Sequence, residues 1–234
     1  MMNTRHSEIA GFFNEWSIYQ KVLKNNYMFH EEIYGTVQKL LAERLQGRTF
    51  SLLDLGCGDA SYIARALAGT TIRQYTGFDL SDTAIAIAER NLGPLNCGLR
   101  LIQTDFLAGL IGNRERYDVI FTGFALHHLH HEDKQRFFQC CAHALNKDGV
   151  LIVVDTFLRD GETAMEYFKA HSAYIRDNWH DYTEPELEAL LRHITTQDIP
   201  ESIDVHRAMA MHAGFRTLSM GSAHLWYQCF YCEP

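Results

Sequence analysis

Four histidines gather in one short stretch of the chain, residues 124–131, which reads FALHHLHH. An imidazole can act as a general base, a substrate ligand or a metal ligand. In a regular helix or strand, adjacent side chains point in different directions, and no cysteine lies nearby to complete a set of metal ligands. We therefore expect no metal ion here. His130 and His131 fit the start of a helix, because the acidic residues that follow them would lie in its first turn.

A glycine turn, LLDLGCGDAS, provides the sharpest chemical pattern. An apolar run leads into Gly56 and Gly58 and then into a helical pattern, so backbone N–H groups of the turn can face a ligand. A dinucleotide site has a third glycine at the sixth position of the motif, where this chain has Ser61. Asp54 and Asp59 would repel a pyrophosphate and suit a ligand that carries positive charge. An NAD(P)-dependent oxidoreductase therefore remains an alternative and not the leading hypothesis.

Two further acids follow the next two predicted strands. Asp79 stands at the end of TGFD, where a carboxylate can accept hydrogen bonds from both hydroxyls of a ribose. Asp105 stands at the end of IQTD beside Phe106, and its carboxylate can accept from the amino group of an adenine. The carboxyl ends of parallel strands meet at one edge of a sheet, so these acids and the glycine turn should line one cleft.

The elements that must position these residues alternate between strand and helix. Apolar runs at FSLLDLG, IRQYTGFDL, LRLIQTD, RYDVIFTGF and VLIVVDT predict five strands, and helical patterns separate most of them. This alternation predicts an α/β fold with a doubly wound parallel sheet and helices on both faces. FRTLSMG and HLWYQCFYC follow a further helical pattern and predict an antiparallel hairpin.

The chain divides into four segments of one domain. Residues 1–46 carry two helical patterns, the first with a capping-box-like start at Ser7, and predict an N-terminal helical cap. Residues 47–156 form the ligand-binding α/β core. Residues 157–200 hold aromatic and histidine-rich helical patterns without a strand, which predicts an inserted helical lid. Residues 201–234 add the last helix and the closing hairpin of the core.

Together these motifs resemble the class I S-adenosylmethionine-dependent methyltransferases. DLGCGDAS is similar to the family's glycine motif, GFDLS to its ribose acid, QTDF to its adenine site, and YDVIFTGFALHHL to its fourth strand and the following loop. Residues 50–155 carry the strongest similarity. The resemblance implies a Rossmann-like sheet of seven strands with the last one antiparallel, S-adenosylmethionine as cofactor and S-adenosylhomocysteine as product. A non-catalytic S-adenosylmethionine-binding protein is the other alternative.

The resemblance also implies roles for individual residues. It puts the loop ALHHL beside the methyl-transfer site, so His127 and His128 are candidates for substrate contact or general base, with loop structure or cofactor contact left open. Asp155 ends the fifth strand at the same edge and is the third catalytic candidate. The candidate cofactor ligands are Tyr19, Asp54, Gly56, Gly58, Asp59, Asp79, Leu80, Asp105, Phe106 and Thr122. The candidate substrate ligands are Tyr27, His30, His171, Tyr174 and Trp179.

The amino-acid composition limits the kinds of partner that the protein can bind. The chain has 21 Lys and Arg against 29 Asp and Glu, a formal net charge of −8, and no basic run, which disfavours nucleic acid. We expect a small-molecule acceptor, with oxygen, nitrogen, carbon or sulfur as the methylated atom. No apolar stretch reaches the roughly 18 residues of a membrane span, and the first residues lack the apolar core of a leader.

The cysteines indicate a reducing compartment. Cys229 and Cys232 lie in a predicted strand, where residues three apart point to opposite faces and cannot share a zinc ion. Cys140 and Cys141 are adjacent, unlike the cysteines of a disulfide-rich scaffold. We expect a cytoplasmic protein, either a monomer or a homodimer.

Overall fold

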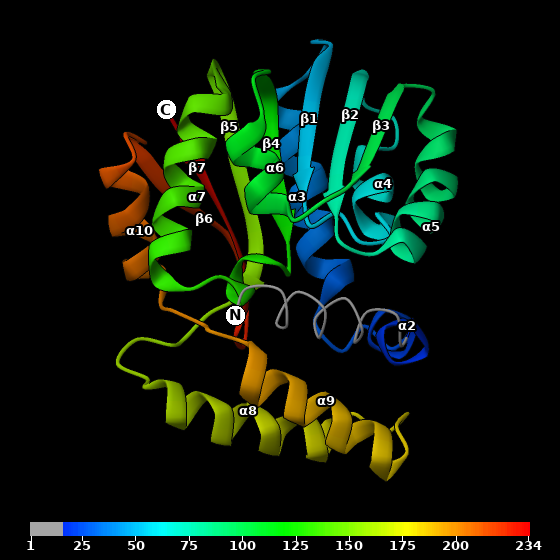
Figure 1. Ribbon diagram of the computed structural model, residues 1–234, viewed down its shortest axis with the longest axis vertical. Helices are drawn as coiled ribbons and strands as arrows, with labels where there is room; N and C mark the ends of the chain where they lie inside the picture. The colour runs from blue at the N-terminus through cyan, green and yellow to red at the C-terminus, as the bar shows by residue number, and fades with distance from the viewer. Residues whose placement is uncertain (1–15) are drawn as a thin grey trace.

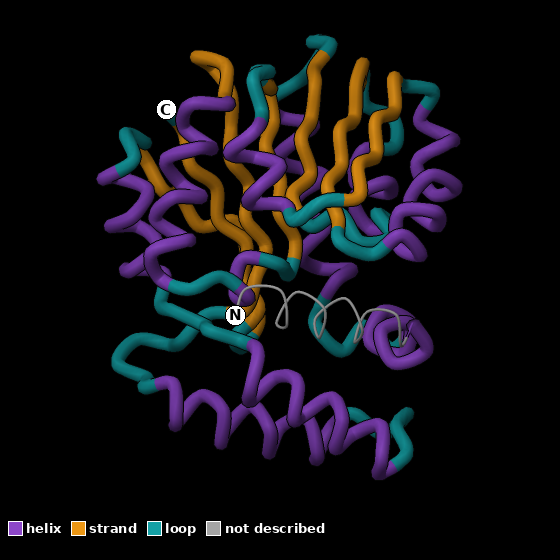
Figure 2. The backbone as a smooth tube through the Cα atoms, in the orientation of Figure 1, coloured by secondary structure: helices purple, strands orange, loops and turns teal. Residues whose placement is uncertain are grey.

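A single seven-stranded sheet forms the centre of the molecule (Figures 1 and 2). The computed structural model describes residues 16–234, so the predicted helix start at Ser7 lies outside the described residues. The strand order is β3-β2-β1-β4-β5-β7-β6. The strands are β1 (Phe50–Leu55), β2 (Ile72–Asp79), β3 (Gly98–Gln103), β4 (Tyr117–Gly123), β5 (Leu145–Thr156), β6 (Thr217–His224) and β7 (Tyr227–Glu233).

Helices connect the strands, and several begin at the polar caps that the sequence provides. The oxygen of Ser81 accepts a hydrogen bond from the backbone N of Ala84 at 3.2 Å, as expected of an N-cap. Across residues 16–234, no helix is long and apolar enough to cross a membrane. The helices are α2 (Trp16–Lys24), α3 (His30–Arg44), α4 (Ser61–Leu67), α5 (Asp82–Leu92), α6 (Phe106–Gly112), α7 (His131–Ala144), α8 (Ala164–Asn178), α9 (Glu184–Gln197) and α10 (Ile203–His212), with short 3₁₀ turns η1 (Gly93–Leu95) and η2 (Leu126–His128).

Two apolar cores lie on the two faces of the sheet. Leu52 packs into the core beneath α3, α4 and α5, whereas its neighbour Leu53 packs into the core beneath α6, α7 and α10. Cys229 and Cys232 divide between the same two cores, so they lie on opposite faces of β7, as predicted. This alternation along each strand lets one sheet bury apolar side chains on both sides.

The pairing of the strands confirms the predicted topology. Strands β1 to β5 pair in parallel, and β7 runs antiparallel to β5 with Leu151 opposite Cys232. Strand β6 pairs antiparallel with the outer side of β7. The sheet is therefore doubly wound, with its last strand in chain order reversed.

Two elements differ from the sequence-based expectation. Helix α6 was not predicted, because its seven residues include two glycines and are too few to show a helical period. Strand β5 starts at Leu145, before the apolar run VLIVVDT, because Leu145 pairs with Tyr117 across a shift in register.

Helices α2, α8 and α9 lie beyond the carboxyl ends of the parallel strands, at the bottom of Figure 1. The ammonium group of Lys21 on α2 contacts both carboxylate oxygens of Glu186 on α9 at 2.8 Å. The hydroxyl of Tyr182 donates to the backbone oxygen of Ile18 at 2.9 Å. These contacts join α2 to the α8–α9 pair across one edge of the sheet.

Helix α3 has a different position, although it belongs to the same N-terminal segment. Its side chains Ile33, Val37 and Leu41 are fully buried against the sheet together with residues of β1 and β4. Its main contacts are with α4 and β6, and not with the helices at the strand ends. Of the helices described in this segment, α2 alone lies over the strand ends, and α3 covers a face of the sheet.

Candidate active site

A cavity of about 410 Å³ lies between the carboxyl ends of the strands and helices α2 and α9. Its wall follows the sheet edge from the loops after β3 and β2, past the glycine turn after β1, to the turn η2 after β4. The sequence-predicted residues that line it are Tyr19, His30, Asp54, Gly56, Gly58, Asp79, Leu80, Asp105, Phe106, His127, His128, His171 and Trp179.

The glycine turn has a backbone that other residues adopt with difficulty. Gly56 has φ of +76° and Gly58 has φ of +51°, both in the left-handed region. A Cβ atom on Gly56 would come within 2.6 Å of the Cβ of Ala125. The backbone N of Gly58 donates to the carboxylate of Asp79 at 2.8 Å, which fixes the turn against the end of β2.

Asp54 is a buried acid at the floor of the cavity. One carboxylate oxygen accepts a hydrogen bond from the hydroxyl of Tyr75. Burial, partly opposed by this bond, raises the pKa of Asp54 to about 7. The other oxygen is buried and has no hydrogen-bond partner in the protein. Because a buried polar atom normally has a partner, this oxygen is suited to a donor group of a ligand.

Asp79 and Asp105 complete the acidic part of the wall. One oxygen of Asp79 accepts from Gly58 and the other accepts from the backbone N of Ser81 at 2.8 Å, while burial raises the pKa of this carboxyl. One oxygen of Asp105 accepts from the backbone N of Ala108 at 2.7 Å and caps α6. Both carboxylates are therefore held in fixed positions at successive strand ends.

His127 is oriented by Asp155. The Nδ1 atom of its ring contacts one carboxylate oxygen of Asp155, and its backbone N donates to the other oxygen at 3.0 Å. Burial opposes protonation of the ring, but Asp155 and Asp198 outweigh it, and the pKa of His127 lies above its usual value. The contact at Nδ1 leaves Nε2 directed toward Asp198, 3.6 Å from its Oδ1.

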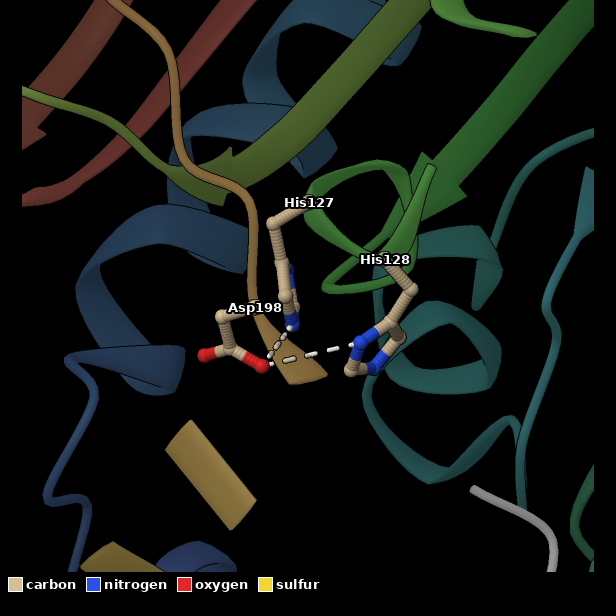
Figure 3. A group of neighbouring side chains, drawn as sticks. All are labelled: His127, His128 and Asp198. Atoms are coloured by element: carbon tan, nitrogen blue, oxygen red, sulfur yellow. Dashed lines mark ion pairs between the residues drawn. The ribbon is translucent and has the colours of Figure 1, made fainter. Parts of the chain in front are cut away.

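His128 joins the same group (Figure 3). Its Nδ1 lies 3.6 Å from Oδ1 of Asp198, and its ring centroid lies 4.0 Å from that of His127. The expectation that these adjacent rings diverge is wrong, because η2 is a tight 3₁₀ turn and not a regular helix or strand. His193 of α9 approaches Oδ1 of Asp198 at 3.9 Å from another side.

Five predicted site residues do not line the cavity. Asp59 accepts two hydrogen bonds from Ser61 at the start of α4, at 3.1 Å and 3.0 Å. Thr122 donates to the backbone oxygen of Leu55 at 2.8 Å. Asp155 lies behind His127 and is a positioning residue. Its carboxylate also accepts a hydrogen bond from the backbone N of Thr156 at 2.7 Å. The remaining two are Tyr27, between α2 and α3, which stacks on Trp179 of the lid, and Tyr174 of α8, which packs against Trp226 between β6 and β7.

Aromatic rings form the wall between the acids and the histidine turn. His30 packs between the rings of Tyr62 and Phe124, with centroids at 5.0 Å and 4.9 Å. Burial lowers the pKa of His30 to about 3, so its ring is neutral and adds to the aromatic surface. Trp179 closes the wall from the lid, where it stacks on Tyr27 with centroids 4.8 Å apart.

Asp198 and His193 are the principal residues that the sequence analysis missed. Both come from the C-terminal part of the lid, about 70 positions after the histidine turn, and no local motif marks them. Asp198 follows α9 directly, and His193 shares a helix with otherwise ordinary amphipathic spacing. The histidine-rich character of the lid was the only signal in the sequence.

The sequence of this chain is similar to those of known methyltransferases. Residues 52–149 match the model of a methyltransferase domain family. An uncharacterized methyltransferase of Bacillus cytotoxicus is 27% identical over 158 residues, which cover 67% of this chain and 71% of that protein. A carboxy-S-adenosyl-L-methionine synthase of Photobacterium profundum is 28% identical over 196 residues, 82% of this chain and 76% of that one.

Solved structures share the fold. A cyclopropane synthase of Mycobacterium tuberculosis superposes with a TM-score of 0.54 and 22% identity, covering 79% of this chain and 62% of the other. A putative sarcosine dimethylglycine methyltransferase of Galdieria sulphuraria gives a TM-score of 0.58 and 20% identity, covering 80% and 63%. The present chain thus spans less than two thirds of these two solved chains.

The sheet with its reversed last strand, the cavity at the strand ends and the methyltransferase domain matched by residues 52–149 support a class I methyltransferase. The matched domain also supports S-adenosylmethionine as the cofactor. The sequence-based hypothesis of this family is confirmed.

Proposed function

We propose that the enzyme methylates a small molecule held at the histidine end of the cavity, beneath the lid. One observation supports the proposal: the type of polar side chain that lines the cavity changes along the sheet edge. Carboxylates lie at the ends of β3, β2 and β1, and histidines follow β4. The cofactor's ribose and amino groups suit the first part, which leaves the second part for the acceptor.

The residues of the acidic part fit the cofactor. Asp79 would accept hydrogen bonds from the ribose hydroxyls, and the unpartnered oxygen of Asp54 would accept from the cofactor's ammonium group. Gly58 has nothing within 4 Å of an added Cβ, so the backbone of the turn would be able to approach the cofactor closely there. When bound, S-adenosylmethionine supplies a methyl group that its sulfonium makes electrophilic.

The chain's own task is to position the acceptor and to exclude water. His127, held by Asp155, and His128 present polar atoms to the acceptor, and the ring of Trp179 covers the cavity from the lid. Alignment of the reacting atoms in a closed, dry site is the main contribution that a protein makes to such a transfer. Asp155 orients His127 and does not itself touch the acceptor.

Synthesis of carboxy-S-adenosylmethionine is the second reaction to be tested, because one relative bears that name. That reaction places a new carboxylate on the cofactor, and a carboxylate in a buried site needs a positive partner. Among the described residues that line the cavity, none is a lysine or an arginine. This lining favours methyl transfer.

The test combines binding with product analysis. Isothermal titration should show binding of S-adenosylhomocysteine, and Asp79→Asn should weaken it by roughly 100-fold, since two charge-assisted hydrogen bonds are lost. Asp82→Asn on the exposed start of α5 is the matched control and should leave the affinity unchanged.

Mass spectrometry of reactions with phenols, amines, thiols and metabolite extracts should find a methylated product together with S-adenosylhomocysteine. Detection of a carboxylated cofactor with no methylated acceptor would contradict methyl transfer. Binding of the cofactor with no product from any acceptor would support the non-catalytic alternative.

We also propose a cytoplasmic protein, a monomer or a homodimer, that does not act on nucleic acid. All six cysteines are free, and four of them are buried, which suits a reducing compartment. The net charge of −8 would repel a phosphate backbone. Light scattering of the purified chain would distinguish the monomer from the homodimer.

A further inference from the structure

The histidine end of the cavity contains a group of side chains that methyl transfer alone does not require. A ring nitrogen of His127, a ring nitrogen of His128 and a carboxylate oxygen of Asp198 all lie within 4.8 Å of one another. Figure 3 shows the two rings and the carboxylate pointing toward a common centre. We infer that these three residues bind one divalent transition-metal ion, with open coordination positions that face the acceptor.

The separations between the ligand atoms suit one ion. Metal–ligand bonds of about 2.1 Å place neighbouring nitrogen and oxygen ligands about 3.0–3.5 Å apart. Oδ1 of Asp198 lies 3.6 Å from Nε2 of His127 and 3.6 Å from Nδ1 of His128. Small rotations of these side chains would bring both pairs that include Asp198 into this range of ligand separations.

Backbone contacts hold the three ligands together independently of their side chains. The turn η2 places the two adjacent rings on one side of the chain, 4.0 Å apart. The backbone N of Ile199 donates to the backbone oxygen of His127 at 2.7 Å, which fastens the segment carrying Asp198 to the histidine turn. The site is thus assembled by the fold before any ion binds.

Asp155 supplies the outer partner that a metal-binding histidine usually has. A histidine ligand commonly binds the metal through one ring nitrogen and donates a hydrogen bond to a carboxylate from the other. In His127 the Nδ1 atom contacts Asp155, while Nε2 faces Asp198. The carboxylate of Asp155 is itself fixed by the backbone N of His127 and of Thr156.

The charges around the group also favour a cation. Asp155 and Asp198 bring two buried carboxylates to opposite sides of His127. Lys134, whose charge acts on His127, pairs with Glu201 at 2.9 Å and donates a hydrogen bond to the backbone oxygen of Ile199. Two imidazoles with one carboxylate favour zinc, ferrous iron and related ions over magnesium or calcium, which prefer oxygen ligands.

The ion would define the class of acceptor, an inference that rests on the proposed methyl transfer. An acceptor with a hydroxyl or thiol group would coordinate the ion through that oxygen or sulfur, and coordination lowers the pKa of such a group. The acceptor's proton leaves to solvent, and its lone pair forms the bond to the methyl carbon. The bond from this carbon to the sulfonium breaks, its electron pair returns to sulfur, and S-adenosylhomocysteine is released.

The test measures metal binding separately from turnover. The 234-residue chain, with any histidine tag removed, is stripped with a chelator and titrated with zinc chloride by calorimetry. Cobalt(II) is then added to a second sample, and its visible absorption reports nitrogen and oxygen ligation. We expect one ion per chain and an absorption band that zinc abolishes.

Variants locate the ion. Asp198→Asn and His128→Ala should each weaken zinc binding by more than about 100-fold, whereas Asp155→Asn, an outer partner, should weaken it by about 10–100-fold. His143→Ala removes an exposed histidine on α7 and should change nothing. If His128→Ala unfolds the chain, His128→Gln serves in its place, with circular dichroism to verify the fold.

Binding below one ion per chain, or binding that survives both Asp198→Asn and His128→Ala, would overturn the inference. S-Adenosylhomocysteine is titrated into the same metal-free protein. If it binds there while zinc does not, the metal site fails and the cofactor site stands. If neither ligand binds, both the metal site and the proposed function fail.

Discussion

The two ends of the cavity are built in different ways. The acidic end takes Asp54, Gly56, Gly58 and Asp79 from a stretch of 26 residues, and each lies at or close to the carboxyl end of β1 or β2. The histidine end brings residues of the turn after β4 together with Asp198, which lies about 70 positions later in the lid. The first end is a product of the sheet itself, whereas the second exists only where the lid meets the sheet.

The strongest test of this difference is Gly56→Ala at the acidic end. The new methyl group would meet the Cβ of Ala125 at 2.6 Å, and the residue would have to keep a φ of +76°. We expect a loss of about 2–4 kcal/mol in the free energy of unfolding and undetectable binding of S-adenosylhomocysteine. Chemical denaturation and calorimetry measure the two effects.

Gly35→Ala is the matched control for that experiment. Gly35 lies inside α3 with nothing within 4 Å of an added Cβ, so alanine should stabilise the chain by about 0.5–1 kcal/mol. Equal effects of the two substitutions would show that Gly56 has no special conformational role.

Asp155→Asn tests the histidine end without touching the acidic end. Loss of the carboxylate removes the partner that fixes the ring of His127, so turnover should fall by about 10–100-fold. Binding of S-adenosylhomocysteine should remain within about twofold of wild type, because Asp155 lies off the cavity. A parallel loss of cofactor affinity would mean that the two ends are not independent.

The aromatic wall between the two ends makes the stability depend on pH. The folded protein resists protonation of His30, whose pKa is about 3, whereas an unfolded histidine titrates near 6.5. The unfolded chain therefore binds more protons below pH 6.5, and this contribution to stability is lost as pH falls from 6.5 toward 3. We expect about 1–2 kcal/mol to be lost through this residue between pH 7 and pH 5.

His30→Phe keeps a ring in the same place and cannot be protonated. The fall in melting temperature between pH 7 and pH 5 should therefore be smaller in this variant than in the wild type. His143→Phe, at an exposed site on α7, should leave the fall unchanged. An identical pH dependence in wild type and His30→Phe would contradict the assignment.

The smallest effect is expected at the contact between α2 and the lid. A double-mutant cycle of Lys21→Ala and Glu186→Ala should give a coupling of about 0.2–1 kcal/mol, as for a partly exposed ion pair. Since α2 carries Tyr19, a cavity residue that senses the charges of Asp79 and Asp54, the Michaelis constant for the cofactor should rise more than that for the acceptor. A larger rise for the acceptor would place α2 over the histidine end instead.

The sequence allowed the acidic end to be predicted because its residues follow a local rule. A strand, a turn without side chains and an acid at the next strand end appear in consecutive segments. The alternation of strand and helix patterns likewise predicted the parallel sheet, and the family resemblance implied its reversed last strand. Thr122 misled this approach, because its position at a strand end does not reveal that its hydroxyl bonds Leu55 instead of facing the cavity.

The histidine end could not be predicted in the same way. The rule that adjacent side chains diverge holds for regular elements and fails in the turn η2, where His127 and His128 converge. Asp198 follows α9, and tertiary contacts determine where α9 lies over the strand ends. A single sequence contains no signal for the distance between Asp198 and the two histidines.

The hydrogen bond from Ile199 to His127 has a consequence for the order of events in a catalytic cycle. It ties the segment directly after α9 to the turn η2, so the approach of Asp198 to the two histidines depends on the position of this segment. A displacement of α9 would break this bond and separate Asp198 from the histidines. On the proposed function, enclosure of the acceptor and assembly of the histidine group would then occur together.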